Sequence, residues 1–172
     1  FLRIIDRFLK AGVLEDGMVS ASEQGTPQGG LVSPALANIY LHYVLDVWFE
    51  KRFAKSCRGK AYLVRYADDF VACFHLEEDA MQFLEELKHR LAAFDLEAEP
   101  TKTRLLRFGD RARAQCKREG LRRPQTFNFL GFTHFVGCTR DGRFVVGHQT
   151  QGERIRKKLK ALNVRLATLR MH

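Results

Sequence analysis

Apolar residues recur along the chain at two spacings, one typical of helices and one of strands. The helical spacing predicts helices at about residues 1–12, 34–54 and 78–94. Before the middle helix, Ser33 is a natural N-cap and Pro34 suits the first helical position. The apolar positions that follow are Leu36, Ile39, Tyr40, Tyr43, Val44, Val47 and Trp48. We therefore expect one continuous buried face along this helix.

Short runs of aromatic and β-branched residues predict paired strands. Residues 61–66 and 70–74 are separated only by Ala67, Asp68 and Asp69, which predicts a β-hairpin with these three residues at its tip. Because hairpins dominate, we expect an α+β fold, an antiparallel sheet with helices packed on one face. Further strands are expected at 18–23, at 96–99 with 103–108, and at 127–136 with 143–146 around a turn at 139–142.

Charge divides the chain into two unlike parts. Residues 1–99 hold 11 Lys and Arg against 16 Asp and Glu, whereas residues 100–172 hold 18 against 4. The basic part includes a cluster at 109–125, expected as an exposed loop, and a basic amphipathic helix after residue 151. Such a surface attracts polyanions, nucleic acid first, although a solvated basic face would have the same composition.

The remaining composition predicts a soluble, cytoplasmic protein without a membrane partner. No run of about 18 apolar residues occurs, and no leader precedes Phe1. Because Phe1 already lies within an apolar periodic segment, we expect a fragment of a longer chain. The cysteines share no CxxC spacing and are expected to be buried, reduced thiols: Cys57, Cys73, Cys116 and Cys138.

The adjacent carboxylates of Asp68 and Asp69 raise a chemical question. Neighbouring residues of a regular strand point to opposite faces, so the two side chains can share a site only where the chain turns. Carboxylates held close together repel each other unless one is protonated or a cation joins them. Mg²⁺ suits such oxygen ligands. An ordinary acidic turn has the same sequence, so the pair alone leaves both interpretations open.

Three further motifs accompany the hairpin. In chain order, the four are TPQGGLVSPALANIYL, LVRYADDFVACF, EAEPTKTRLLRF and FNFLGF. Together they resemble the reverse transcriptases encoded by group II introns, over about residues 11–152. The resemblance implies an RNA-directed DNA polymerase with a palm-like sheet, which extends a DNA primer on an RNA template with dNTPs. It also implies two catalytic Mg²⁺ ions, with Mn²⁺ as a substitute.

The same resemblance implies roles for individual residues. Asp68 and Asp69 would bind the catalytic metal ions, with Asp68 as the principal ligand. The residues expected to approach the template and the incoming nucleotide are Pro27, Gln28, Gly29 and Asn38, with Thr26 shaping their loop. Lys102 would either lie near the nucleotide's phosphates or be a solvated turn lysine. The primer grip, which steadies the primer end, would comprise Leu130, Gly131 and Phe132, for which a buried strand with a glycine kink is the alternative.

The resemblance also suggests how the chain is organised. Residues 1–150 would be the palm without its fingers and first strand, and residues 151–172 the start of a thumb or maturase helix. The parent protein would bind its intron RNA, assist splicing and mobility, and associate with the bacterial nucleoid when acting on DNA. Two alternatives stay open: another bacterial reverse transcriptase of the retron, diversity-generating or defence type, or an RNA-binding maturase module without catalysis.

One catalytic group is expected to be missing from the chain. The family takes a third carboxylate from a palm strand that precedes the first helix, and no residue here replaces it. Asp6 falls within that helix, whereas Glu15 and Asp16 are expected in the turn after it. We therefore predict that the 172-residue chain alone makes no DNA when given primer, template, dNTPs and Mg²⁺. Primer extension that disappears in an Asp68→Ala variant would contradict this prediction.

Overall fold

A computed structural model describes residues 2–9, 13–15, 18–20 and 32–170. Its contacts divide the chain into two compact units, Phe1–Ala98 and Glu99–His172. Both units contain helices and small antiparallel sheets, so the predicted α+β class is confirmed. The predicted division into a palm at 1–150 and a following helix at 151–172 stays a prediction.

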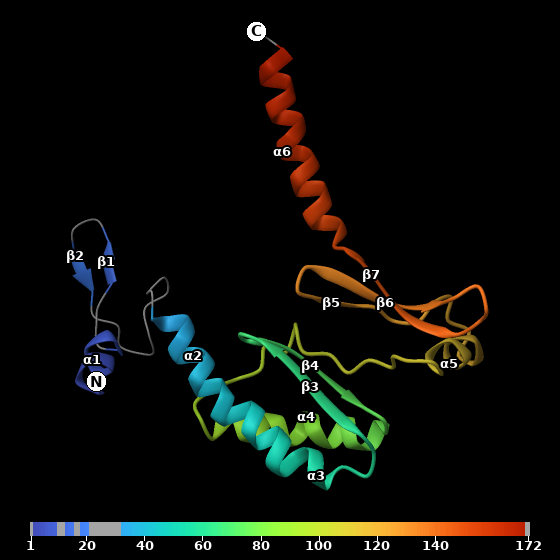
Figure 1. Ribbon diagram of the computed structural model, residues 1–172, viewed down its shortest axis with the longest axis horizontal. Helices are drawn as coiled ribbons and strands as arrows, with labels where there is room; N and C mark the ends of the chain where they lie inside the picture. Colours follow the sequence, from blue (N-terminus) through green and yellow to red (C-terminus); the bar gives the residue numbers. More distant parts are fainter. Residues whose placement is uncertain (1, 10–12, 16–17, 21–31, 171–172) are drawn as a thin grey trace. The chain divides into compact units, whose positions relative to one another are not determined.

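The first unit is built around one long helix and one hairpin (Figure 1). The helix runs without interruption over residues 33–56, although parts of it are π-helical. Its segments are α2 (Ser33–Leu41), η1 (His42–Asp46), η2 (Phe49–Phe53) and α3 (Ala54–Ser56). The other elements are α1 (Leu2–Leu9), β1 (Val13–Glu15), β2 (Met18–Ser20), β3 (Ala61–Tyr66), β4 (Asp69–Phe74) and α4 (Glu77–Ala92). Glu15 therefore ends a strand instead of lying in the predicted turn.

The long helix confirms the predicted element, but only part of the predicted stripe, Val44 and Trp48, is buried. Its buried side chains are Val44, Leu45, Trp48, Phe49 and Phe53. The predicted stripe began earlier, yet Ile39, Tyr40 and Tyr43 are 58%, 45% and 65% exposed. Ile39 and Tyr40 lie in α2, before the π-helical segments, so a changed period does not explain their exposure. Further along, a π-helical turn holds more residues than an α-helical turn, and burial reaches Phe49 and Phe53, which the 3.6-residue period did not predict. The helix also begins at Ser33 itself, with Val32 at the N-cap.

An aromatic cluster joins the long helix, α4 and the hairpin. The ring of Phe83 on α4 lies 5.1 Å from that of Phe53, 5.6 Å from that of Phe49 and 6.0 Å from that of Trp48. The hairpin contributes its inner face, on which Leu63, Phe70 and Phe74 pack against the cluster. Both helices therefore cover the same face of the hairpin, as predicted (Figure 1).

The segment after α4 contradicts the prediction of a second strand pair. Residues 96–99 and 103–108 form no strand. At the end of α4, Asp95 adopts a φ of 54°, and the backbone N–H of Leu96 donates to the carbonyl of Leu91 at 3.0 Å. Leu96 and Ala98 then pack against the aromatic cluster. Apolar and acidic residues alternate over 96–99 because one side of this extended segment packs on the core. The segment does not pair with another strand.

The second unit is a three-stranded antiparallel meander with a helix on either side in sequence. Its elements are α5 (Ala112–Arg118), β5 (Phe127–Phe129), β6 (Phe132–Cys138), β7 (Phe144–Thr150) and α6 (Gly152–Arg170). The predicted turn at 139–142 is confirmed, whereas the predicted strand 127–136 is divided at Leu130 and Gly131. The basic segment 109–125 is more than a loop, because α5 buries Ala112 and Cys116 on one face, four residues apart.

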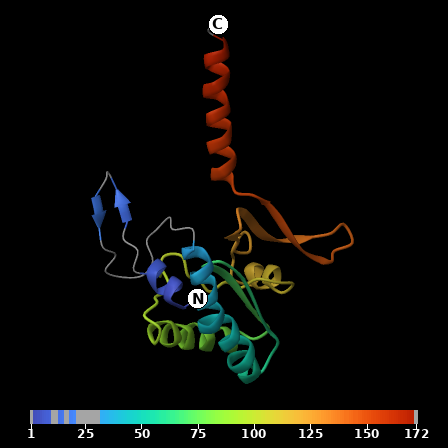
Figure 2. The ribbon, with the colours of Figure 1, turned by 60° about the vertical axis from the view of Figure 1, so that its left-hand side comes forward.

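The helix α6 extends away from its sheet (Figure 2). Every residue from Gly152 to Arg170 is exposed, including the apolar stripe from Ile155 to Leu169. The basic amphipathic helix is therefore confirmed. In the described ranges, no helix is both long enough and apolar enough to span a bilayer.

The cysteines are free thiols, as expected, but they are not all buried. Cys116 is buried and Cys57 half-buried, whereas Cys73 and Cys138 are exposed. Cys73 lies on the outer face of the β3–β4 hairpin, opposite the aromatic cluster, which explains why its apolar sequence neighbours gave a wrong prediction.

The aromatic cluster predicts which substitutions destabilise the first unit. Leu87 on α4 is 1% exposed, so Leu87→Ala should lower the free energy of unfolding by about 2–5 kcal/mol through lost burial and a cavity. Met81 on the same helix is 56% exposed, and Met81→Ala should change it by about 0.5 kcal/mol or less. Urea denaturation followed by circular dichroism measures both. Equal effects of the two substitutions would contradict the described core.

Candidate functional site

The paired carboxylates lie at a tight turn of the β3–β4 hairpin. Tyr66 and Asp69 face each other as the last pair of the ladder, so Ala67 and Asp68 alone form the turn. Ala67 has a φ of 53°, and two-residue hairpin turns require such a left-handed residue. Both aspartates are exposed. The predicted hairpin is confirmed, with a tip shorter by one residue because Asp69 belongs to β4.

The hairpin presents an open face next to these aspartates. Along β3, burial alternates, and the outward side chains of Tyr62, Val64 and Tyr66 are 61%, 57% and 65% exposed. Asp69 is directly opposite Tyr66 in the ladder, so cross-strand partners place it on the same outer face. The first unit therefore offers two solvent-accessible carboxylates at the end of an exposed, partly aromatic strand surface.

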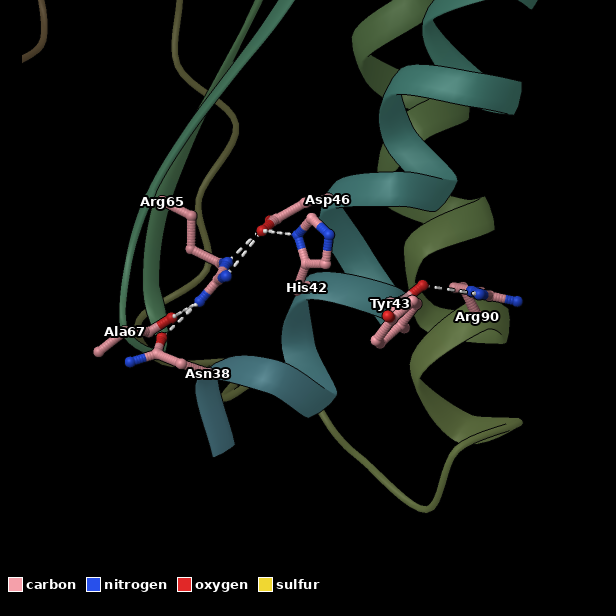
Figure 3. A network of polar contacts seen from close by, with 7 residues as sticks. All are labelled: Asn38, His42, Tyr43, Asp46, Arg65, Ala67 and Arg90. Carbon is pink, nitrogen blue, oxygen red and sulfur yellow. Dashed lines mark hydrogen bonds and ion pairs between the residues drawn. The ribbon is translucent and has the colours of Figure 1, made fainter. Parts of the chain in front are cut away.

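A polar network beneath the tip connects the hairpin to the long helix (Figure 3). The guanidinium of Arg65 donates from Nε and Nη2 to the two carboxylate oxygens of Asp46, each at 2.7 Å. Its Nη1 donates to the carbonyl of Ala67 at 2.7 Å and to Oδ1 of Asn38 at 2.9 Å. On the other side of Asp46, Nδ1 of His42 lies 3.3 Å from its carboxylate. The side chain of Arg65 thus contacts the hairpin tip at Ala67 and the long helix at both Asn38 and Asp46.

Within the network, the ion pair of Arg65 and Asp46 is partly shielded from water, whereas Asn38, His42 and Ala67 are exposed. The side chain of Arg65 is 12% exposed and that of Asp46 is 25% exposed. The hydrogen bonds from Arg65 hold the pKa of the Asp46 carboxyl below its ordinary value, against the opposing effect of burial. The same hydrogen bonds raise the pKa of Arg65. The pair is therefore ionised in both partners near neutral pH.

The predicted site residues are distributed unevenly in the structure. Asn38 lies beside the hairpin tip, because it shares Nη1 of Arg65 with the carbonyl of Ala67. Thr26, Pro27, Gln28 and Gly29 lie outside the described residues. Lys102 belongs to the second unit, where it is exposed in a turn and its backbone N–H donates to the carbonyl of Glu99 at 3.1 Å. Its predicted role stays a prediction.

The predicted primer grip forms a tight turn in the second unit. Leu130 and Gly131 connect β5 to β6 with φ angles of 50° and 83°. The φ of Gly131 favours glycine, whereas the guanidinium of Arg154, which a Cβ at position 131 would meet, is the end of an exposed, flexible side chain and can move aside. The carbonyl of Gly131 accepts a hydrogen bond from the backbone of Gln151 at 3.2 Å. Leu130 and Phe132 are exposed, at 46% and 43%.

The chemistry of the aspartates fits Mg²⁺ as part of a coordination shell. Both side chains are exposed carboxylates, and Mg²⁺ is commonly held by one or two carboxylates together with water and substrate phosphates. In the part of the chain that the structure describes, no three His, Cys, Asp or Glu side chains gather closely enough to hold a metal ion. Asp68 and Asp69 would therefore supply some of the ligands and leave the others to substrate, water or further protein groups.

The network around Arg65 was not predicted from the sequence, although the sequence contains a signal for it. On β3, Arg65 follows Leu63 by two residues and so falls on the inner, core-facing side. A charged residue at such a position needs a partner, because an unpaired buried charge is very costly. Asp46 follows the apolar residues Val44 and Leu45 of the long helix, and it forms an ion pair with Arg65.

Comparison with known proteins identifies the family. Residues 2–134 match the family model described as reverse transcriptase (RNA-dependent DNA polymerase). This match covers most of the chain and includes the hairpin, the network beneath it and the predicted primer grip. The chain belongs to the reverse transcriptase family.

Individual relatives match over shorter segments. The group II intron-encoded protein LtrA of Lactococcus lactis subsp. cremoris is 58% identical over 40 residues, which are 23% of this chain and 7% of that protein. An uncharacterized 91 kDa protein in the cob intron of Schizosaccharomyces pombe is 48% identical over 50 residues, 29% of this chain and 6% of that protein. Protein YkfC of Escherichia coli is 32% identical over 96 residues, 41% of this chain and 25% of that protein. The matches thus span a quarter or less of each relative.

The lowered pKa of Asp46 predicts how stability depends on pH. A carboxyl group whose pKa is lowered by folding stabilises the folded state fully at any pH above its pKa in the unfolded chain, which is about 4. This stabilisation is lost as the pH falls further. The gap in urea midpoint between the wild-type chain and Asp46→Asn should therefore be constant near neutral pH and shrink below about pH 4. Urea titrations at a series of pH values measure this gap.

A second background isolates the contribution of Arg65 to that gap. In an Arg65→Gln chain the main cause of the pKa shift is absent, so Asp46→Asn should produce only a small gap at any pH. A gap of undiminished size in the Arg65→Gln background would contradict the assigned pairing.

Proposed function

We propose that this chain is the palm portion of an RNA-directed DNA polymerase of the group II intron type. The observation that carries the proposal is the two-residue turn that presents Asp68 beside Asp69 at the end of an open strand surface. The family match over residues 2–134 and the likeness to LtrA support it. In this proposal the complete parent protein copies RNA into DNA and binds its own intron RNA.

The catalytic step would be in-line attack of a primer 3′ hydroxyl on the α-phosphate of a dNTP, with pyrophosphate as the leaving group. Asp68 and Asp69 would hold the divalent ions, which when bound activate the hydroxyl and neutralise charge on the phosphates. The protein's own task is then positioning. Because both carboxylates are solvent-accessible, primer and nucleotide can approach them from the open face of the hairpin.

Other residues would orient the substrates around this point. Asn38 is already placed beside the tip, where it would border the nucleotide, and the loop with Pro27, Gln28 and Gly29 would contact the templating base pair. In the second unit, the exposed turn of Leu130, Gly131 and Phe132 would steady the primer end, and Lys102 would lie near the phosphates. These assignments follow the family resemblance and are proposals.

The basic second unit supports a nucleic-acid partner. Its helix α6 is exposed throughout and carries basic residues along its length: Arg154, Arg156, Lys157, Lys158, Lys160, Arg165 and Arg170. Lys and Arg that neutralise phosphates release counterions, so binding to RNA should weaken steeply as salt rises. This surface is equally suited to a binding-only maturase module, which is the second candidate function. The retained pair of aspartates favours catalysis.

Substitution of Asp68 in the complete parent protein separates these candidates. With primer, RNA template, dNTPs and Mg²⁺, Asp68→Asn should reduce DNA synthesis by roughly 10²-fold or more, because it removes charge from the metal site. The Asn side chain is nearly isosteric, so RNA affinity in a filter-binding assay should stay unchanged.

The β6–β7 turn offers a matched control. Asp141 is also an exposed aspartate in a hairpin turn, and Asp141→Asn should leave synthesis unchanged. DNA synthesis that is absent from the wild-type parent with either Mg²⁺ or Mn²⁺, while RNA binding is intact, would favour the binding-only module and reject the proposed polymerase.

A further inference from the structure

Arg65 combines two kinds of contact that a purely structural ion pair would not need. Two of its nitrogens bind the carboxylate of Asp46 side by side, which fixes the plane of the guanidinium. The third nitrogen, Nη1, points to the turn and donates to the carbonyl of Ala67 at 2.7 Å. The helix thereby holds the orientation of one backbone carbonyl at the hairpin tip (Figure 3).

That carbonyl is the one next to Asp68. The peptide group between Ala67 and Asp68 is planar, so the direction of the Ala67 carbonyl also fixes the direction of the Asp68 N–H and limits where its Cα lies. Ala67 adopts a φ of 53°, a conformation that L-residues other than glycine rarely adopt without surrounding support. A charge-assisted hydrogen bond to its carbonyl supplies such support.

We propose that Arg65 is a positioning residue for the Asp68 carboxylate, acting through the Ala67 carbonyl with Asp46 as its fixed anchor on the long helix. The inference rests on the proposed polymerase function and deepens it. In a two-metal site a ligand displaced by about 1 Å can reduce turnover about 10²-fold. Arg65 touches neither substrate nor metal in this assignment, and it acts on metal binding and on the chemical step only through the position of the Asp68 carboxylate.

The geometry also predicts which substitution is informative. The Arg65→Lys substitution keeps a positive charge near Asp46, but an ammonium group cannot bind both carboxylate oxygens side by side and still reach a third acceptor in the guanidinium plane. The substitution therefore preserves the charge and removes the orientation. Arg58 is the matched control, because its side chain is 74% exposed and forms an ion pair with the exposed Glu78 at the surface of the same unit.

Steady-state kinetics of the complete parent protein test the proposal. Arg65→Lys should lower kcat for nucleotide addition by about 10- to 100-fold and raise the Mg²⁺ concentration needed for half-maximal rate. It should change KM for dNTP and the Kd for primer-template by less than about twofold. Arg58→Lys should leave all of these values unchanged. Asp46→Asn, which leaves the guanidinium one acceptor oxygen and no opposite charge, should change them in the same direction as Arg65→Lys when it is assayed well below its own unfolding midpoint.

Other kinetic results would overturn the assignment. An unchanged kcat would show that the turn is positioned without Arg65. A rise in the Kd for primer-template with kcat preserved would identify Arg65 as a nucleic-acid contact. A loss of kcat that merely follows a lower thermal unfolding midpoint would identify a structural ion pair; a variant that retains the wild-type midpoint and loses kcat supports positioning.

Hydrogen exchange separates a failure of this inference from a failure of the proposed function. In Arg65→Lys the amides of residues 66–70 should exchange faster than in the wild type, whereas Arg58→Lys should match the wild type. This readout needs no catalysis, so it reports on the turn even if the parent protein makes no DNA. Equal exchange at the tip in both variants would overturn the role of Arg65, whatever the activity assay gives.

Discussion

The burial of the aromatic cluster around Phe83 is the constraint on which the rest of the first unit depends. The long helix, α4 and the hairpin meet there, and each contributes aromatic or aliphatic side chains. Because strand residues alternate between faces, burying Leu63, Phe70 and Phe74 decides the orientation of every other residue in the hairpin. A slip of one residue would turn Tyr62, Val64 and Tyr66 inward and carry Arg65 out to solvent. The position of the carboxylates is therefore set by packing well away from them.

Arg65 is the one charged side chain that this alternation places on the inner side of β3. A paired charge in such a place adds little net stability, because losing water costs about as much as the pairing returns. What the Arg65–Asp46 pair contributes is a fixed orientation of the guanidinium. The guanidinium has a fixed plane and several donors, so it converts the rigid placement of Asp46 on the helix into a defined orientation of the turn. Arg90 makes a similar connection from α4 to the long helix, where it donates to the carbonyl of Tyr43 (Figure 3). It also donates to the carbonyl of Val44.

The sequence predicts those features that depend on local pattern. The long helix, the hairpin around Asp68 and Asp69, the turn at 139–142 and the basic helix α6 are all recognisable from spacing and turn residues, and the ordered motifs identify the family. What it does not predict depends on tertiary contacts. The long helix buries its apolar side chains only from Val44 to Phe53, where they pack with α4 and the hairpin. The extended segment with Leu96 and Ala98 looks like a strand in sequence but lies on the core. In the sequence, Arg65 and Asp46 are charged residues at positions where apolar ones are expected. Their pairing becomes visible only in the folded structure.

The alanine at the hairpin tip determines how the site can move. The methyl group of Ala67 makes a φ of 53° unfavourable, whereas a glycine at position 67 would adopt it readily. The turn is therefore strained, and it keeps this backbone conformation only while its contacts hold it. When metal ions and substrates bind and leave, the carboxylates can adjust by rotation about their side-chain bonds or by rigid-body movement of the hairpin. A larger change at the tip requires the hydrogen bond from Arg65 to the Ala67 carbonyl to break, after which the strain at Ala67 favours a different turn conformation.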